Sequence, residues 1–220
     1  MKKMHVDSVL KSYDNRQILS DVFISCEKGE IIGLLGRNGI GKSTLLKIIF
    51  GSIKADNKFV RVDSKYIKGI FDNRNLIKYL PQNNFLPNHV KIKTIIKLFC
   101  DKKNTSIIIN NHLIKPLLDK KSNQLSGGEK RILEIFLIVL SNAKYILIDE
   151  PFNGVAPVHK KEIKNLIIKQ SENKGFIITD HDYRNVLDIA TRTVIIHDGG
   201  TKEIKNNEEL IEYGYIRELN

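Results

Sequence analysis

The chain has 220 residues, of which 41% are hydrophobic and 28% are charged, a balance that fits a folded globular protein and excludes a disordered one. This length supports one domain with a sizeable core and is too short for two large independent domains. The net charge of +11 raises the possibility of nucleic-acid binding, but the lysines are scattered and no run of five basic residues occurs. No nucleic-acid partner is therefore expected, and solvated lysine faces or attraction to an anionic lipid surface explain the charge better.

Neither a membrane span nor a secretion signal is visible in the sequence. The densest apolar stretch, residues 132–140, is interrupted by Glu134 and falls short of the ~18 residues that cross a bilayer. Residues 1–14 lack the apolar run of a signal peptide, so the chain is expected to be cytoplasmic. Cys26 and Cys100 form no CxxC pair and have no histidine at metal-ligand spacing, which predicts two buried free thiols.

The N-terminal residues 4–25 form two extended stretches around the turn-rich Asp14, Asn15 and Arg16, which predicts an antiparallel hairpin at the edge of the fold. Short apolar runs then predict buried strands at residues 31–35, 145–148, 176–178 and 194–196. Helical segments are expected between them at residues 43–50, 129–140, 160–170 and 183–190. Strands that alternate with helices predict the α/β class, with a mostly parallel sheet.

The middle of the chain has a different character. Residues 83–142 contain Pro87, Pro116 and polar breaks at 101–106 and 120–124, with helix-compatible stretches at 90–100 and 107–118. We therefore predict a helical subdomain at 83–142, inserted into an α/β core formed by residues 1–82 and 143–220.

A phosphate-binding loop follows the first predicted strand of the core. The pattern G-x-x-x-x-G-K-S/T is satisfied directly after the apolar residues 30–35. Its residues are Gly36, Arg37, Asn38, Gly39, Ile40, Gly41, Lys42, Ser43 and Thr44. Glycines let the backbone N–H groups turn inward towards phosphate, and the helix that begins there adds its positive end. Lys42 would neutralise phosphate charge and Ser43 would ligate Mg²⁺.

Two adjacent carboxylates end the predicted strand near residue 148. Asp149 would lie beside the phosphate-binding loop and hold Mg²⁺ through water, and Glu150 would face the attacking water. A strand that simply ends in solvated acids is the alternative, and the phosphate-binding loop in the same chain weighs against it.

Residues 125–129 contain a second helix start that suits an anion. Ser126 and Glu129 have the spacing of a capping box, which would explain these two residues on its own. It would not explain Gly127 and Gly128, which let an anion approach the free N–H groups of the helix. Two phosphate-binding helix starts and one nucleotide motif suggest a site shared between two subunits.

With these motifs in order, the chain resembles the ATPases of the ABC (ATP-binding cassette) transporter family over essentially its whole length. The resemblance implies that Tyr13 stacks on adenine and that residues 36–44 bind the phosphates of ATP. It implies that Gln82 contacts Mg²⁺ and the lytic water, that Glu150 is catalytic and that His181 senses the γ-phosphate. Taken singly, Tyr13 is more often a packing aromatic and His181 more often a structural histidine. The implied metal ligands are Ser43, Gln82 and Asp149.

The same resemblance implies partners and a location. Ser126, Gly127 and Gly128 would close over the ATP of another subunit in a homodimer or in a heterodimer with a similar ATPase. A separate transmembrane permease would carry the substrate, with this chain peripheral on the inner face of the cell membrane. Short similarities at residues 150–155, 178–181 and 213–217 resemble the lipopolysaccharide-export and branched-chain amino-acid uptake subgroup.

Two departures from the family pattern leave alternatives open. Ala156 stands where the family usually has an aspartate that touches the partner subunit, and the stretch from Gln82 to Leu125 is short for the helical subdomain. A non-hydrolysing ATP-dependent regulator is one alternative, against which Glu150, Gln82 and His181 argue. An ABC-type ATPase that acts on nucleic acid or ribosomes is the other, but the tandem cassette or long coiled coil of those relatives is missing.

Overall fold

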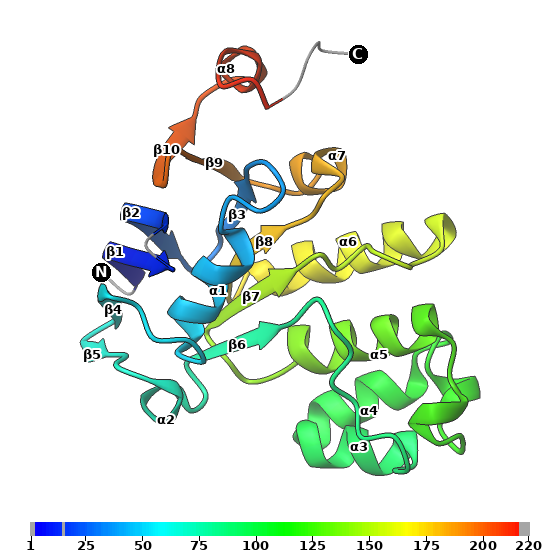
Figure 1. Ribbon diagram of the computed structural model, residues 1–220. Helices are drawn as coiled ribbons and strands as arrows, with labels where there is room; N and C mark the ends of the chain where they lie inside the picture. Colours follow the sequence, from blue (N-terminus) through cyan, green and yellow to red (C-terminus); the bar gives the residue numbers. More distant parts are fainter. Residues whose placement is uncertain (1–2, 15, 216–220) are drawn as a thin grey trace.

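The computed structural model describes residues 3–14 and 16–215, which form two β-sheets with helices packed around them (Figure 1). The predicted antiparallel hairpin is confirmed as β1 (Lys3–Tyr13) and β2 (Arg16–Glu27). Asn15, at the centre of the predicted turn, lies outside the described residues. The sheet continues with β4 (Asn57–Val62) and β5 (Lys65–Tyr66) in the order β2-β1-β4-β5, and sequence analysis missed both of these short strands.

The central sheet has the strand order β10-β9-β3-β8-β7-β6. The strands β3 (Ile31–Leu35), β7 (Tyr145–Asp149), β8 (Gly175–Thr179) and β9 (Arg192–His197) correspond to the four predicted apolar runs. They pair in parallel, as does β6 (Ile77–Leu80) with β7, whereas β10 (Gly200–Ile204) pairs antiparallel with β9. The predicted α/β class with a mostly parallel core is therefore confirmed.

Helices cover both faces of the central sheet. α1 (Lys42–Phe50) follows β3, α5 (Gly127–Val139) precedes β7, and α6 (Pro157–Ser171) and α7 (Tyr183–Leu187) flank β8 in the chain. The short helices are α2 (Ile70–Asn73) and α8 (Asn207–Glu212). None of the helices in the described part of the chain has both the length and the apolar character needed to cross a membrane.

The middle of the chain is helical, as predicted, but the predicted stretch at 107–118 was wrong at both ends. α3 (Ile92–Phe99) falls within the predicted stretch, and α4 (Lys102–Asn110) begins inside the supposed polar break. The reason is a cap: the carboxylate of Asp101 accepts a hydrogen bond from the backbone N–H of Asn104 at 2.8 Å, so polar residues start this helix. After α4 the chain continues through two single 3₁₀ turns, Lys115–Leu117 and Ser122–Gln124. The proposed subdomain boundaries at residues 82/83 and 142/143 stay a prediction.

The core has two layers because successive residues of each central strand face opposite sides of the sheet. Ile32 and Leu34 of β3 pack with α1 and the antiparallel sheet on one side. On the other side, Ile146 and Ile148 of β7 pack with α5, α6 and the apolar faces of α3 and α4. The middle helices thus share one hydrophobic core with this face of the central sheet. This shared core fixes the position of α5 relative to β7.

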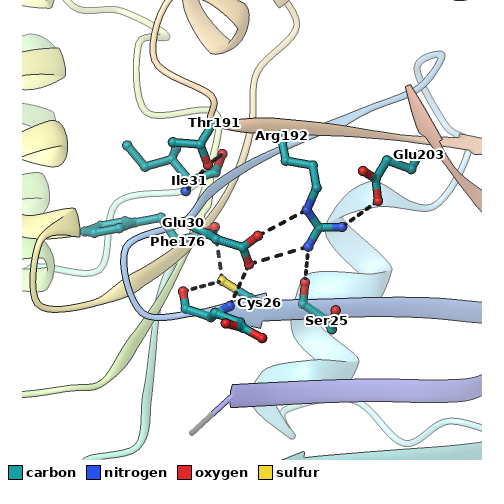
Figure 2. Close-up of polar contacts among 9 residues, drawn as sticks. Ser25, Cys26, Glu30, Ile31, Phe176, Thr191, Arg192 and Glu203 are labelled. Carbon is teal, nitrogen blue, oxygen red and sulfur yellow. Dashed lines mark hydrogen bonds and ion pairs between the residues drawn. The ribbon is translucent and has the colours of Figure 1, made fainter. Parts of the chain in front are cut away.

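A polar network joins the two sheets near the start of β9 (Figure 2). Arg192 of β9 donates to the backbone carbonyl of Ser25 in β2 at 2.5 Å and pairs with Glu30 at 3.3 Å and Glu203 at 2.9 Å. Beside it, the buried Cys26 thiol donates to the carbonyl of Phe176. Because the guanidinium of this β9 residue contacts β2, β10 and the residue before β3, it ties the antiparallel sheet to the central one.

The two cysteines are free thiols, as predicted. Cys26 is fully buried, whereas Cys100 is only half-buried, so the prediction of burial was right for one and incomplete for the other. Cys100 sits at the C-terminal end of α3, where the helix reaches the protein surface.

Candidate functional site

The phosphate-binding loop connects β3 to α1. Gly39 and Gly41 have φ angles of 78° and 113°, in the left-handed region that favours glycine. A Cβ atom at Gly41 would lie only 2.9 Å from a methyl carbon of Ile18, so this position also requires a close backbone approach to β2. The loop can therefore fold tightly enough to present its backbone N–H groups, together with those at the start of α1, to one small region.

Lys42 lies across this loop. Its ammonium group donates to the carbonyl of Gly36 at 2.5 Å and to that of Arg37 at 3.1 Å. Burial lowers the pKa of Lys42, against the attraction of the Glu150 and Asp149 carboxylates. The positive charge is thus held at the centre of the loop by backbone dipoles and lies near the two acids.

Asp149 is the last residue of β7 and is 1% exposed. One carboxylate oxygen accepts a hydrogen bond from the Ser43 hydroxyl at 3.1 Å, and the other accepts from the Tyr79 hydroxyl at 2.9 Å. Burial raises the pKa of Asp149, and these two hydrogen bonds act in the opposite direction. The β7 carboxylate and the α1 hydroxyl are therefore in direct contact.

Glu150 leaves the strand in a left-handed conformation with φ of 50°, and its backbone N–H donates to the carbonyl of Thr179 at 2.8 Å. Its carboxylate accepts a hydrogen bond from the side-chain amide of Gln82 at 2.8 Å. His181 follows the end of β8 at Thr179 by two residues. Its Nδ1 atom lies 3.3 Å from the buried Asp180 carboxylate. The ends of β6, β7 and β8 thus bring Gln82, Glu150 and His181 to one edge of the sheet.

These groups surround a cleft of about 680 Å³. Of the predicted site residues, those that line it are Tyr13, Asn38, Gly39, Gly41, Lys42, Ser43, Thr44, Gln82, Glu150 and His181. Asp149 lies just beneath, behind Ser43. Residues from five separate stretches of the chain converge here, which no single motif could show.

Other predicted residues lie elsewhere. Gly36 contributes its carbonyl to Lys42, whereas the Arg37 side chain turns away and donates to the carbonyl of Gly214 at 2.9 Å. Ile40 lines a separate small cavity with Tyr213 and other residues. These three positions shape the loop rather than the wall of the cleft.

Residues 125–129, called here the signature residues, lie at the start of α5, the signature helix, and do not line the cleft of their own chain. The predicted capping box is confirmed: Glu129 N–H donates to the Ser126 hydroxyl at 3.2 Å, and Ser126 N–H donates to the Glu129 carboxylate at 2.7 Å. A Cβ atom at Gly127 would meet nothing within 4 Å, whereas one at Gly128 would lie 2.9 Å from the carbonyl of Gly154. The glycine-led start of α5 is therefore open on the Gly127 side.

Sequence reasoning missed several residues of the site. Ile18 and Asn153 line the cleft, and Tyr79 holds Asp149. Ile18 lies on β2, whose pairing with β1 places it near Tyr13, so the predicted hairpin could have pointed to it. Tyr79 precedes Gln82 by three residues, but only the pairing of β6 with β7 reveals its contact. Asn153 carried no signal. Ala156, the departure from the family pattern, is exposed at the N-cap of α6 and makes no side-chain cap there.

A parallel sheet with a phosphate-binding loop at the carboxyl end of β3 and two acids at the end of β7 defines a P-loop nucleotide hydrolase. The family model described as ABC transporter matches residues 19–153. The chain is 32% identical to the lipopolysaccharide export system ATP-binding protein LptB of Haemophilus influenzae, over 99% of this chain and 98% of that protein. It is 30% identical to the ergothioneine transport ATP-binding protein EgtV of Helicobacter pylori, over 87% and 95% of the two chains.

A solved structure described as the ATP-binding subunit of an ABC transporter has the same fold, with a TM-score of 0.85 at 20% identity over 96% of this chain and 93% of that one. The chain therefore belongs to the ABC transporter family, as an ATP-binding and ATP-hydrolysing subunit that powers transport. The resemblance to the lipopolysaccharide-export subgroup agrees with the similarity to LptB; its branched-chain amino-acid half stays a prediction.

Proposed function

We propose that the protein binds ATP with Mg²⁺ in the 680 Å³ cleft and hydrolyses it there, as one subunit of a dimer that drives a separate membrane permease. The single observation that carries this proposal is the convergence of the phosphate-binding loop with Gln82, Glu150 and His181 around one space. The loop supplies N–H donors and the Lys42 charge for the phosphates, and the three other side chains lie where the γ-phosphate and its attacking water would meet.

The residues present fit a magnesium ion. The contact between the Ser43 hydroxyl and the Asp149 carboxylate is an oxygen pair beside the phosphate loop, which suits Mg²⁺ because this ion takes few protein ligands and several phosphate and water oxygens. Ser43, Asp149 and Gln82 would hold it, and when bound it would neutralise charge on the phosphates. The group of three or more His, Cys, Asp or Glu side chains that a closed protein cage would need is absent from the described residues.

Hydrolysis in this proposal depends on orientation. Glu150 aligns the attacking water or accepts a proton from it. Gln82, which is hydrogen-bonded to Glu150, contacts the same water from the opposite side. His181, braced by Asp180, would contact the γ-phosphate from the β8 end. Tyr13 is 44% exposed at the rim of the cleft, where its ring offers adenine a stacking surface.

The dimer follows from the position of the signature helix. Ser126, Gly127 and Gly128 lie outside their own cleft, yet the start of α5 is open to an anion on the Gly127 side. A second copy, or a similar ATPase, would bring its triphosphate against this helix start. ATP would then join two subunits, each completing the site of the other.

The permease and the location are also proposals. The relatives with which the chain aligns end to end are named as ATP-binding proteins of transport systems, which supports a separate subunit for the passage of the substrate. We propose that this chain sits on the inner face of the cell membrane, where it binds such a permease. The surplus of lysine and arginine would favour an anionic lipid surface.

The test is steady-state ATP hydrolysis by the purified protein with Mg²⁺, compared with the Glu150→Gln variant and with Glu172→Gln as a control on an exposed carboxylate outside the cleft. We expect Glu150→Gln to lower kcat by at least about 100-fold while ATP still binds, because the group that aligns the water or accepts its proton is lost and the phosphate loop is unchanged. Glu172→Gln should behave as the parent protein. Equal turnover by Glu150→Gln and the parent would show that Glu150 does not have the proposed role.

A further inference from the structure

A buried ion pair inside α5 contacts both catalytic segments of the same chain. Arg131 and Glu134 are 4% and 0% exposed, and the guanidinium lies 3.6 Å from one oxygen of the carboxylate. Burying two charges is costly unless each is paired and hydrogen-bonded. The other partners of these two side chains therefore show what the pair does in the fold.

Arg131 donates to three backbone carbonyls on two different segments. One terminal nitrogen donates to Pro81 at 2.6 Å, and the other donates to Asp149 at 2.5 Å and to Glu150 at 3.0 Å. Pro81 immediately precedes Gln82, so a single planar group joins the start of the Gln82 loop to the end of β7. The guanidinium reaches the two segments with two separate terminal nitrogens held in one plane, whereas a lysine ammonium has a single nitrogen.

The conformation of Glu150 depends on these contacts. Its φ of 50° is unfavourable for a residue with a side chain, and such a conformation persists only where the surroundings hold it. The Thr179 carbonyl holds the N–H of Glu150 and Arg131 holds its carbonyl, so both sides of this residue are fixed. The direction of the Glu150 carboxylate follows from that backbone.

Glu134 fixes the other end of the Gln82 loop. One of its oxygens accepts the backbone N–H of Phe85 at 2.8 Å, while the other faces Arg131 and has no hydrogen bond. The loop from Pro81 to Phe85 is thus held at both ends by neighbouring turns of α5. Since the Gln82 amide donates to Glu150, the pair sets both groups of the hydrolytic couple.

We propose that Arg131 is a positioning residue for ATP hydrolysis, with Glu134 as its partner, so that the signature helix orients Glu150 and Gln82 of its own chain. This inference rests on the proposed function of that cleft. It gives α5 two tasks: its first turn faces the nucleotide of the other subunit, and its second and third turns align the hydrolytic residues of its own. A shift of α5 would then move the backbone of Glu150 through its hydrogen bond to Arg131.

The test compares kcat, at saturating ATP and Mg²⁺, with the Kd for a non-hydrolysable ATP analogue, for Arg131→Met, Arg131→Lys and Glu134→Gln. Arg131→Met should lower kcat about 100-fold and change Kd by less than about threefold, because positioning is lost while the phosphate loop is intact. Arg131→Lys should recover only part of kcat. Glu134→Gln, whose amide oxygen still accepts from Phe85, should lose about tenfold.

Lys174→Met is the matched control. Lys174 lies between α6 and β8, is 8% exposed and donates to the carbonyls of Val139 and Ser141, so it is a buried cation that contacts the C-terminal end of α5, away from the cleft. Its loss should lower the thermal midpoint and leave kcat per folded molecule within about twofold of the parent. Arg131→Met should differ from it in kcat even when both are compared at equal folded fraction.

The inference is overturned if Arg131→Met keeps kcat within about threefold of the parent, or loses activity only in proportion to its unfolded fraction as Lys174→Met does. Should Arg131→Met fail to fold, Arg131→Lys and Glu134→Gln decide by the same criterion. Glu150→Gln separates the two proposals. If it is inactive while the Arg131 and Glu134 variants are fully active, the inference fails and the proposed function stands; if it is active, the proposed function fails.

Discussion

Replacing Gly127 by alanine separates the needs of the single chain from those of the proposed shared site. In the single chain a Cβ atom at this position meets nothing within 4 Å, and alanine favours a helix over glycine by up to about 1 kcal/mol. The free energy of unfolding should therefore stay the same or rise by at most about 1 kcal/mol. If two chains share ATP, the substitution should lower only the rate of ATP hydrolysis.

The expected functional loss follows from the geometry of anion binding. A phosphate oxygen must come within about 2.9 Å of the helix N–H groups, and a methyl group on the open side of Gly127 would hold it away. A displacement of about 1 Å costs on the order of 100-fold in rate. We expect that decrease in kcat, measured by phosphate release, together with unchanged urea unfolding.

Gly128→Ala provides the contrast. Its Cβ would lie 2.9 Å from the Gly154 carbonyl within the same chain, so this variant should also lose stability, by about 1–3 kcal/mol. If Gly127→Ala hydrolyses ATP as fast as the parent, the open glycine does not face a nucleotide and the reasoning is refuted. A loss of stability in Gly127→Ala would equally contradict the open space assigned to it.

Two further predictions concern the polar network and the thiols. Arg192→Met should lower the free energy of unfolding by about 1–3 kcal/mol, because the Ser25 carbonyl and the Glu30 carboxylate lose their donor. Urea titration measures this free energy, with Arg16→Met, at an exposed position, as the control. Equal effects of the two substitutions would contradict the prediction. Burial raises the pKa of the Cys100 thiol to about 11, so less of it is thiolate at pH 8 than of an ordinary cysteine. Alkylation of Cys100 at pH 8, followed by mass spectrometry, should be about 100-fold slower than that of free cysteine and should accelerate as the pH rises towards 11. The fully buried Cys26 should react more slowly still, and rapid labelling of either would contradict the prediction.

The parts of the site that sequence could predict are local in the chain. The phosphate loop, the acids after β7 and the capping box of Ser126 and Glu129 each depend on neighbouring residues, so their spacing alone indicates their structure. Their assembly into one cleft depends on strand order. Tyr79 reaches Asp149 only because β6 pairs with β7, a contact across 70 positions.

The role of Arg131 is also invisible to local sequence patterns. In the sequence it is one of two adjacent basic residues on a largely apolar helix, for which a solvated position would be the ordinary expectation. Its burial follows from three carbonyls that tertiary packing gathers around it, and no pattern within α5 reveals them. The error at α4 has the opposite origin: a polar segment looked like a break because the Asp101 cap was not recognised.

The central claim is that two chains enclose ATP between them, and the molar mass of the Glu150→Gln variant tests it most directly. Light scattering after size-exclusion chromatography should give the mass of two 25.2 kDa chains with ATP and Mg²⁺, and of one chain when either is omitted. Blocked hydrolysis should preserve the ATP-bound pair for the duration of the measurement. A single-chain mass at saturating ATP and Mg²⁺ would contradict the account.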